Sequence, residues 1–226
     1  HFQDRINVNQ FLVDGTAVTP SPSARNIGVM FDKTMSMRPQ VTAVCQSAHF
    51  HLRNIGQIRR YITSNACEKL IHAFVTSRLD CGNALLFGLP QTQMKRLQRV
   101  LNIAARILTF TLRYDSITPV LKELHWLPVE RRIDFKLLLL TFKCLNGLAP
   151  VYLSSLLVSY APTRSLRSSD TNLLQIPRMA TKSYGERAFC YAAPKLWNSL
   201  PQKIRCITSL EQFKTTIKTH LFRLAY

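Results

Sequence analysis

A change of hydrophobic period near Pro39 constrains the fold of this 226-residue chain more than any other feature. Before it, Asp14-Gly15 separates two β-prone runs, which is a strong signal for a two-residue hairpin. An alternation typical of a third short strand follows at Ile27, Val29 and Phe31. After Pro39, apolar residues recur at the three- and four-residue spacings of an amphipathic helix, through to residue 62. We therefore predict a mainly α fold with a small N-terminal β element.

A long amphipathic helix is predicted over residues 91–113. At about 100° per residue, one of its faces is apolar and carries Leu97, Val100, Leu101, Ala104 and Leu108. A second face, within about 40°, carries Lys95, Arg99, Arg106 and Arg113. Four cations on one helix fit two interpretations, a solvated surface or a face that contacts phosphates.

The stretch ELHWLPVERR, residues 123–132, predicts the start of another helix. Pro128 suits the first helical position because its missing N–H would have no partner there. The helix is expected to end at Gly147. Trp126 is expected to pack beneath the helix start. Its neighbour His125 has no nucleophile or carboxylate partner at a catalytic spacing, so we interpret it as a structural histidine.

Capping residues place the other helices. Ser64 or Asn65 is expected to cap a helix that ends near residues 80–82. A loop with one short strand at 173–176 precedes a helix that breaks at Pro201. Ser209 and Gln212 form a capping-box pattern for the last helix. Its predicted apolar stripe is Phe213, Ile217 and Leu221.

The strongest functional signal is the net charge of +18, from 30 Lys and Arg against 12 Asp and Glu. Such an excess favours polyanions through counterion release. A basic protein that is merely soluble, or that associates with anionic membranes, is the alternative. Beyond the long helix, basic residues lie close to aromatic ones or in Ser-rich stretches, and the candidates for phosphate contact are Arg53, Arg59, Arg60, Arg164 and Arg167.

Several functional classes are disfavoured. No apolar run reaches membrane-spanning length, and neither a P-loop nor a dinucleotide fingerprint occurs. The six cysteines form no paired motif, which indicates buried thiols in a reducing compartment. Cys45, His49 and His51 lack a fourth ligand for zinc. Acidic residues are scattered singly, unlike those of a two-metal centre, so we assign no catalytic or metal-binding residue.

Five stretches in this order carry a resemblance: SRLDCGNALLFGLP, LQRVLNIAARIL, ELHWLPVERRIDFKLLLLTFKCLNGLAPVYL, RSLRSS and AAPKLWNSLP. They resemble the C-terminal part of the reverse transcriptase reading frame of jockey-like non-LTR retrotransposons (LINEs), over nearly the whole chain. The resemblance implies that residues 1–37 are the end of a polymerase palm and 38–160 a helical thumb-like domain. Residues 161–226 would be a basic C-terminal region.

In that family the thumb holds the template–primer duplex. The resemblance implies that this chain binds RNA, RNA–DNA hybrid or DNA, contacts the upstream palm and fingers, and works in the nucleus and cytoplasm without a membrane. The catalytic Tyr/Phe-Ala-Asp-Asp motif has no counterpart here. We therefore expect a truncated chain that is inactive alone and holds no cofactor, whereas the parent polymerase would use Mg²⁺. The alternative is a degenerate relic, or a host-adopted interaction module without enzymatic activity.

Overall fold

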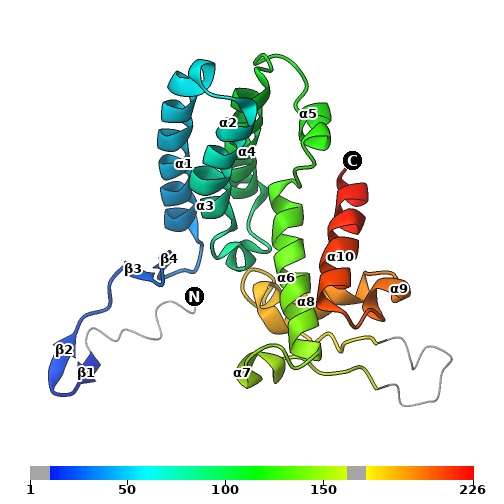
Figure 1. Cartoon of the computed structure of the whole chain (residues 1–226). Helices are drawn as coiled ribbons and strands as arrows, with labels where there is room; N and C mark the ends of the chain where they lie inside the picture. The colour runs from blue at the N-terminus through cyan, green and yellow to red at the C-terminus, as the bar shows by residue number, and fades with distance from the viewer. Residues whose placement is uncertain (1–10, 162–171) are drawn as a thin grey trace.

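The computed structural model describes residues 11–161 and 172–226. The protein is mainly helical, with two small antiparallel sheets near the N-terminus (Figure 1). This confirms the predicted mainly α class with a small N-terminal β element. The first sheet extends away from the helices, whereas the second packs against the N-terminal end of the first long helix, and Val29 of this sheet is buried in the helical core. The helices form two neighbouring groups that meet along the central helix α6 (Val129–Leu145).

The predicted hairpin at Asp14-Gly15 is confirmed. Strands β1 (Phe11–Val13) and β2 (Thr16–Val18) pair with Val13 opposite Thr16. Asp14 and Gly15 both have positive φ, 49° and 77°, as the tight turn of a two-residue hairpin requires.

The predicted third strand is wrong at its first residue. A second hairpin pairs β3 (Ser23–Asn26) with β4 (Val29–Asp32), and Ile27-Gly28 is its turn. Ile27 has φ 46° and is 95% exposed. Side-chain alternation could not reveal this turn, because a β-branched residue rarely adopts positive φ.

Asp32 connects the second hairpin to helix α1 (Arg38–Ile58). Its carboxylate accepts hydrogen bonds from the Thr34 hydroxyl (2.6 Å) and from the backbone N–H groups of Ser36 (3.0 Å) and Met37 (2.8 Å). Burial works to raise the pKa of Asp32, but these hydrogen bonds outweigh it and hold the pKa well below its usual range. The ionised carboxylate therefore fixes the chain just before α1.

Replacing Asp32 by Asn should lower the free energy of unfolding by about 1–2 kcal/mol at neutral pH, because charged acceptors are lost. A depressed folded-state pKa contributes stability above the ordinary value of 3.8 and loses it as the pH falls further. The difference between the two proteins should therefore shrink below that pH. Urea denaturation at pH values between 7 and 3 measures it, and a difference independent of pH would contradict the prediction.

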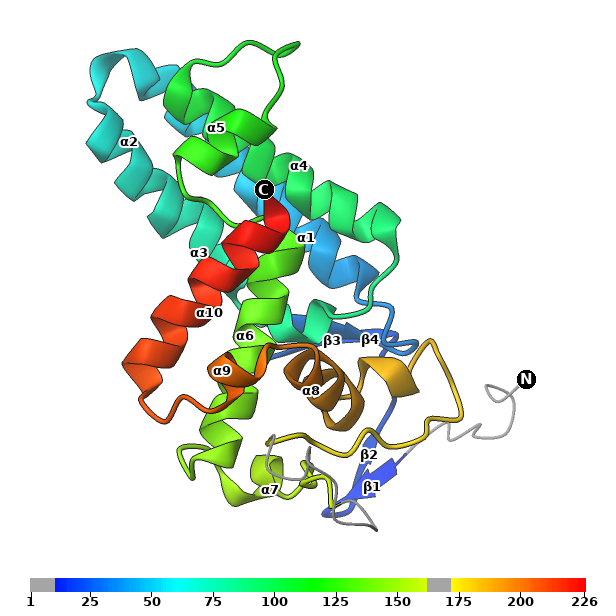
Figure 2. The same ribbon diagram turned by 90° about the vertical axis from the view of Figure 1, so that its right-hand side faces the viewer.

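Helices α1 and α4 (Gln91–Thr109) pack side by side and run parallel (Figure 2). Near their N-terminal ends, Arg96 of α4 donates to Thr42 of α1 (3.1 Å). Near their C-terminal ends, a Cβ atom placed on Gly56 would lie 3.9 Å from the Ile107 side chain. The small residues Ala48 and Gly56 allow this close approach, and Ala48 is fully buried.

One continuous helical run connects these two helices after the 3-10 turn η2 (Arg59–Tyr61). It consists of α2 (Ser64–Ile71), the π-helical turn η3 (His72–Thr76) and α3 (Ser77–Asp80), followed by the 3-10 turn η4 (Asn83–Leu86). The capping residue is Thr63 rather than the predicted Ser64 or Asn65. Its hydroxyl accepts from the Ala66 N–H at 3.2 Å.

The predicted helix over 91–113 ends early. Phe110 adopts the left-handed conformation (φ 57°), so α4 stops at Thr109. The Thr109 hydroxyl bonds the Ala105 carbonyl and the Thr111 hydroxyl, and such side-chain bonds compete with helix continuation. Arg113 is therefore not on the helix, and a short helix α5 (Thr118–Glu123) follows instead.

Helix α6 starts one residue later than predicted and ends where predicted. Pro128 is extended (ψ 154°) and its carbonyl accepts from the Arg132 N–H (3.0 Å), so it caps the helix instead of opening it. At the other end, Gly147 has φ 67° and the Leu148 N–H bonds the Lys143 carbonyl (2.8 Å). This is the expected glycine-terminated helix end.

The C-terminal part consists of α7 (Val151–Ser154), η5 (Gly185–Arg187), α8 (Phe189–Asn198), α9 (Gln202–Arg205) and α10 (Leu210–Ala225). Of these, α7, α8 and α10 contact α6, whereas η5 contacts α8 and α9 contacts α10. The predicted strand at 173–176 is only a single bridge between Leu174 and Ser159. The Ser209 side chain makes no capping bond, so the predicted capping box is not formed. The predicted apolar stripe of the last helix is buried, as expected.

Two hydrophobic clusters hold the molecule together, and α6 contributes to both. Ile133 and Leu137 belong to the first cluster with α1 and α4, whereas Leu138 and Phe142 belong to the second with α8 and α10. Trp126 is buried in the first cluster, close to the start of α6. The two cores are therefore continuous through one helix, and the division at residue 160 stays a prediction. Within the described ranges, no helix combines the length and apolar character needed to cross a membrane.

Candidate nucleic-acid interface

A basic groove lies between α1 and α4. It has a volume of about 480 Å³ and no carboxylate lines it. We call the following lining residues the α1/α4 groove: Cys45, Gln46, His49, Phe50, Arg53, Arg96 and Arg99. The groove exists because the two parallel helices approach closely below it, while longer side chains rise on either side.

Arg96 is held in place by neutral partners. Its guanidinium donates to the Thr42 hydroxyl on the other helix and to the side-chain amide oxygen of Gln93 on its own helix, both at 3.1 Å. Because neither partner is charged, the arginine keeps its full positive charge. A cation fixed in this way loses less side-chain entropy when it binds an anion.

Arg53 and Arg99 are exposed on the two sides of the groove, and in the described part of the chain neither has a carboxylate within 4.0 Å. Phe50, which also lines the groove, is 61% exposed. Arginines suit phosphate oxygens, and an exposed ring suits base stacking. The combination is what a nucleic-acid backbone with accessible bases would need.

Cys45 at the base of the groove is not a reactive thiol. Burial raises the pKa of Cys45, and the positive charge of Arg96 opposes this only in part. The His49 Nδ1 atom lies 2.6 Å from the Cys45 carbonyl oxygen, so that ring nitrogen is occupied by the backbone. His51 stacks on Phe74 with ring centroids 5.0 Å apart. Over residues 11–161 and 172–226, no group of three or more His, Cys, Asp or Glu side chains could hold a metal.

The prediction that the cysteines are buried thiols is correct for three of the six. Cys45, Cys67 and Cys144 are buried, Cys190 is half-buried, and Cys81 and Cys206 are exposed. All six are free thiols.

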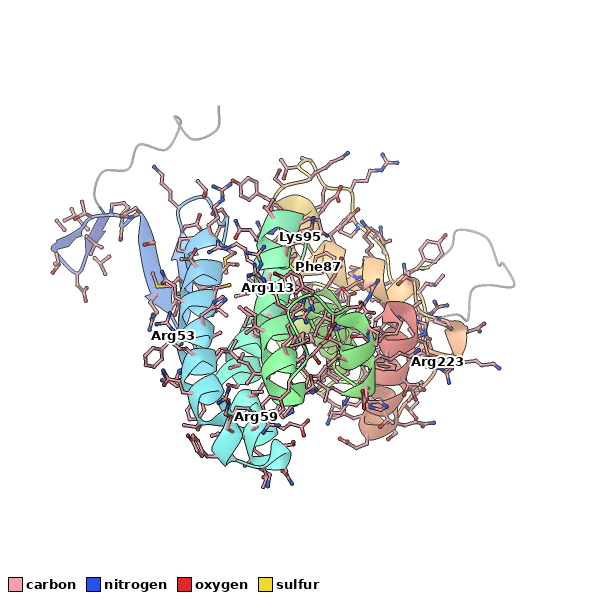
Figure 3. All side chains as sticks on the ribbon, turned by 90° about the horizontal axis from the view of Figure 1, so that it is seen from above. Arg53, Arg59, Phe87, Lys95, Arg113 and Arg223 are labelled. Carbon is pink, nitrogen blue, oxygen red and sulfur yellow. The ribbon has the colours of Figure 1, made fainter. Side chains whose placement is uncertain are left out.

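Arg59 was predicted to contact phosphates, and its position is incompatible with that role. It is 6% exposed and lies at the junction of α1 and α2 (Figure 3). Its guanidinium donates to the carbonyls of Ile107 (3.1 Å), Leu108 (2.8 Å) and Ile62 (3.1 Å), and to the Ser64 hydroxyl (3.0 Å). A sequence reading counts its charge but cannot see that its donors are used inside the fold.

Arg106 and Arg113 do not extend the basic face of α4 as predicted. Arg106 donates to the carbonyls of Leu112 and Asp115 (2.7 Å to the latter), so it closes the loop that follows the helix. Arg113 is an exposed residue of that loop. The predicted face of four cations therefore loses its last member, because the helix ends four residues earlier.

The other predicted residues lie apart from the groove or outside the described residues. Lys95 is exposed on the neighbouring side of α4, in a hollow that also contains Glu130 and Tyr226. Arg60 is exposed in the turn η2. Arg164 and Arg167 lie outside the described residues. Of the nine predicted contacts, the structure brings together Arg53 and Arg99.

Arg96, His49 and Phe50 were missed by sequence reasoning. Arg96 follows Lys95 directly, and one residue rotates the side chain by about 100° around a helix, so it fell outside the predicted basic face. A signal was nevertheless present, because Arg96 and Arg99 are three residues apart and therefore share one side of the helix.

A comparison with protein-family models, with curated proteins and with solved structures found no match to this chain.

Proposed function

We propose that the chain binds nucleic acid through the α1/α4 groove, with Arg53, Arg96 and Arg99 contacting backbone phosphates. The observation that supports this most is a groove with three arginines and no lining carboxylate, in a protein of net charge +18. Counterion release gives such a surface affinity for any sugar–phosphate chain. Phe50 adds a face on which an unpaired base stacks.

We further propose that this binding serves a LINE-type reverse transcriptase, as the segment that holds its template–primer. In this role the chain has no polymerase activity alone, since the paired catalytic aspartates belong to a palm upstream. The N-terminal hairpins support this reading. Leu12, Val13 and Val18 are 79%, 60% and 47% exposed, and isolated two-stranded sheets are only marginally stable in water. A larger sheet upstream would cover them.

The groove is tested with the double variant Arg53→Gln/Arg99→Gln. Each lost phosphate contact should cost about 1 kcal/mol, so affinity for an RNA–DNA hybrid should fall about 30-fold. The slope of log K against log salt should become shallower by about 0.9 for each lost contact. Fluorescence anisotropy with hybrids of several sequences measures both quantities, and all sequences should weaken alike.

The matched control is Lys203→Gln/Arg223→Gln, which removes the same charge elsewhere. Both residues are exposed, and Arg223 lies on the opposite side of the molecule from Arg53 (Figure 3). The control should weaken binding by no more than about two-fold, through long-range charge alone. Equal losses in the two variants would reject the groove as the binding surface and leave only diffuse attraction.

The alternative, a host-adopted interaction module, has one observation in its favour. Val151, Tyr152 and Val158 are 84%, 74% and 55% exposed, in a stretch without charged residues. Exposed apolar patches of this kind mark contacts with other proteins. A module of this type would bind RNA–DNA hybrids only weakly, and Arg53→Gln/Arg99→Gln would leave that weak affinity unchanged. The same titration therefore distinguishes an interaction module from a nucleic-acid-binding segment.

A further inference from the structure

A second hollow lies between the helical run α2–η3–α3 and the pair α6/α10. It has a volume of about 570 Å³, within the range of ordinary ligand pockets. Its floor is the loop Leu124–Leu127, and we call it the α3/α6 pocket. It shares no lining residue with the α1/α4 groove, and Figure 2 shows α10 and α3 on the same side of the molecule as the C-terminus.

The pocket has walls of opposite charge. Glu68 and Asp80 come from the α2–α3 side, whereas Lys136 of α6 and Lys218 of α10 face them. The Asp80 carboxylate is already paired with Arg132 at 2.9 Å, so those two charges offset each other. Both lysines are exposed, and neither has a carboxylate within 4.0 Å in the described part of the chain. Glu68, 43% exposed, lies with one carboxylate oxygen 3.5 Å from the His72 Nε2 atom, and a carboxylate can accept further hydrogen bonds from a ligand between it and the two lysines.

The aromatic surface open to the pocket is the His72 ring, whose side chain is 47% exposed. The Trp126 ring lies 5.5 Å from it but is buried, so it supports the His72 ring and offers no open face of its own. The Trp126 backbone is fixed at both polar groups, because its N–H bonds the Leu121 carbonyl (2.9 Å) and its carbonyl accepts from the Tyr226 hydroxyl (2.7 Å). His72 opens the π-helical turn, and its Nδ1 lies 3.0 Å from the Thr76 hydroxyl. π-helical turns occur frequently at functional sites.

We propose that the α3/α6 pocket binds a single nucleotide that carries a phosphate and an amine-bearing base. The phosphate lies against Lys136 and Lys218, the base stacks against the His72 ring, and its exocyclic amine donates to Glu68. This ligand matches the three features of the pocket: a cationic wall, an exposed histidine ring and a carboxylate on the far wall. The site goes beyond the proposed function, because the groove needs only backbone phosphates.

The proposal is tested by isothermal titration calorimetry of the whole chain with AMP, CMP, UMP and adenosine. AMP and CMP should bind. UMP, which lacks the exocyclic amine, should bind at least five-fold more weakly, and adenosine, which lacks the phosphate, at least ten-fold more weakly. Equal affinity for AMP and UMP, or no binding of AMP at millimolar concentration, would overturn the proposal.

Two variants locate the site. Lys136→Gln/Lys218→Gln should weaken AMP at least ten-fold without changing the melting temperature, because both side chains are exposed. Arg53→Gln/Arg99→Gln should leave AMP affinity unchanged, so failure of the groove and failure of the pocket are distinguishable. AMP binding that survives the lysine variant would place the nucleotide elsewhere and reject the proposal.

The nucleotide could be free or the end of a strand, and competition separates the two sources. A short RNA with a 5′-phosphorylated adenosine is added to the AMP complex of the Arg53→Gln/Arg99→Gln variant. Displacement of AMP that requires the 5′-phosphate assigns the pocket to a strand end. Retention of AMP assigns it to the free nucleotide.

Discussion

Replacing Arg59 by alanine is expected to lower the free energy of unfolding by at least about 3–4 kcal/mol, since a hydrogen bond from a charged donor contributes about 1.5–3 kcal/mol and the guanidinium makes four of them. Three carbonyls would lose their donor: those of Ile62, Ile107 and Leu108. The guanidinium carbon also lies 4.2 Å from the centre of the Phe110 ring, so a cation–π contact is lost as well. For a chain of this size the melting temperature should fall by about 10 °C.

The matched control is Arg60→Ala, which removes the same side chain one residue away. Arg60 is exposed, so its loss should change stability by less than about 0.5 kcal/mol. Urea denaturation of both variants measures the difference. If Arg59→Ala unfolds like the parent protein but binds nucleic acid much more weakly, the structural role assigned to Arg59 is wrong and the original sequence prediction is right.

The second large effect is expected from Phe213→Ala in α10. Phe213 is fully buried and its ring stacks on Phe142 of α6, with centroids 4.4 Å apart. The ring centroid of Trp197 in α8 lies 5.8 Å from that of Phe213. Truncating a buried phenylalanine to alanine costs about 3–5 kcal/mol, because the lost contacts leave a cavity.

The Phe213→Ala variant also tests whether residues 161–226 unfold separately from the rest of the chain. Since α6 belongs to both clusters, we expect one cooperative transition, with near-ultraviolet circular dichroism and far-ultraviolet ellipticity changing together. Phe213→Leu, which keeps most of the volume, should cost about 1.5 kcal/mol or less and serves as the control. A loss below 1 kcal/mol for Phe213→Ala would show that α10 does not depend on α6.

Features that depend on neighbouring residues could be predicted from the sequence. The Asp14-Gly15 turn, the change to helical spacing and the glycine end of α6 each follow from backbone preferences within a few residues. The early end of α4 could not be predicted. It depends on Arg106 reaching Leu112 and Asp115, and on Phe110 adopting a conformation that few phenylalanines adopt.

The candidate site was only half predictable for a related reason. Charge and helical spacing singled out Arg53 and Arg99 as exposed cations. Which cations meet depends on how α1 and α4 align, and that alignment is set by buried contacts such as Ala48 and by the bond from Arg96 to Thr42. The burial of Arg59 depends on the same alignment, because two of its acceptors, the carbonyls of Ile107 and Leu108, belong to α4.

The parallel arrangement of α1 and α4 has an electrostatic consequence. Each helix carries a macrodipole, with about half a positive charge at its N-terminus and half a negative charge at its C-terminus. In antiparallel neighbours these fields cancel, whereas here both positive ends lie near Thr42 and Arg96, and both negative ends lie near Arg59. A polyanion in the groove would therefore meet a potential that rises toward the N-terminal ends, which gives the bound strand a preferred end at which to be held most tightly.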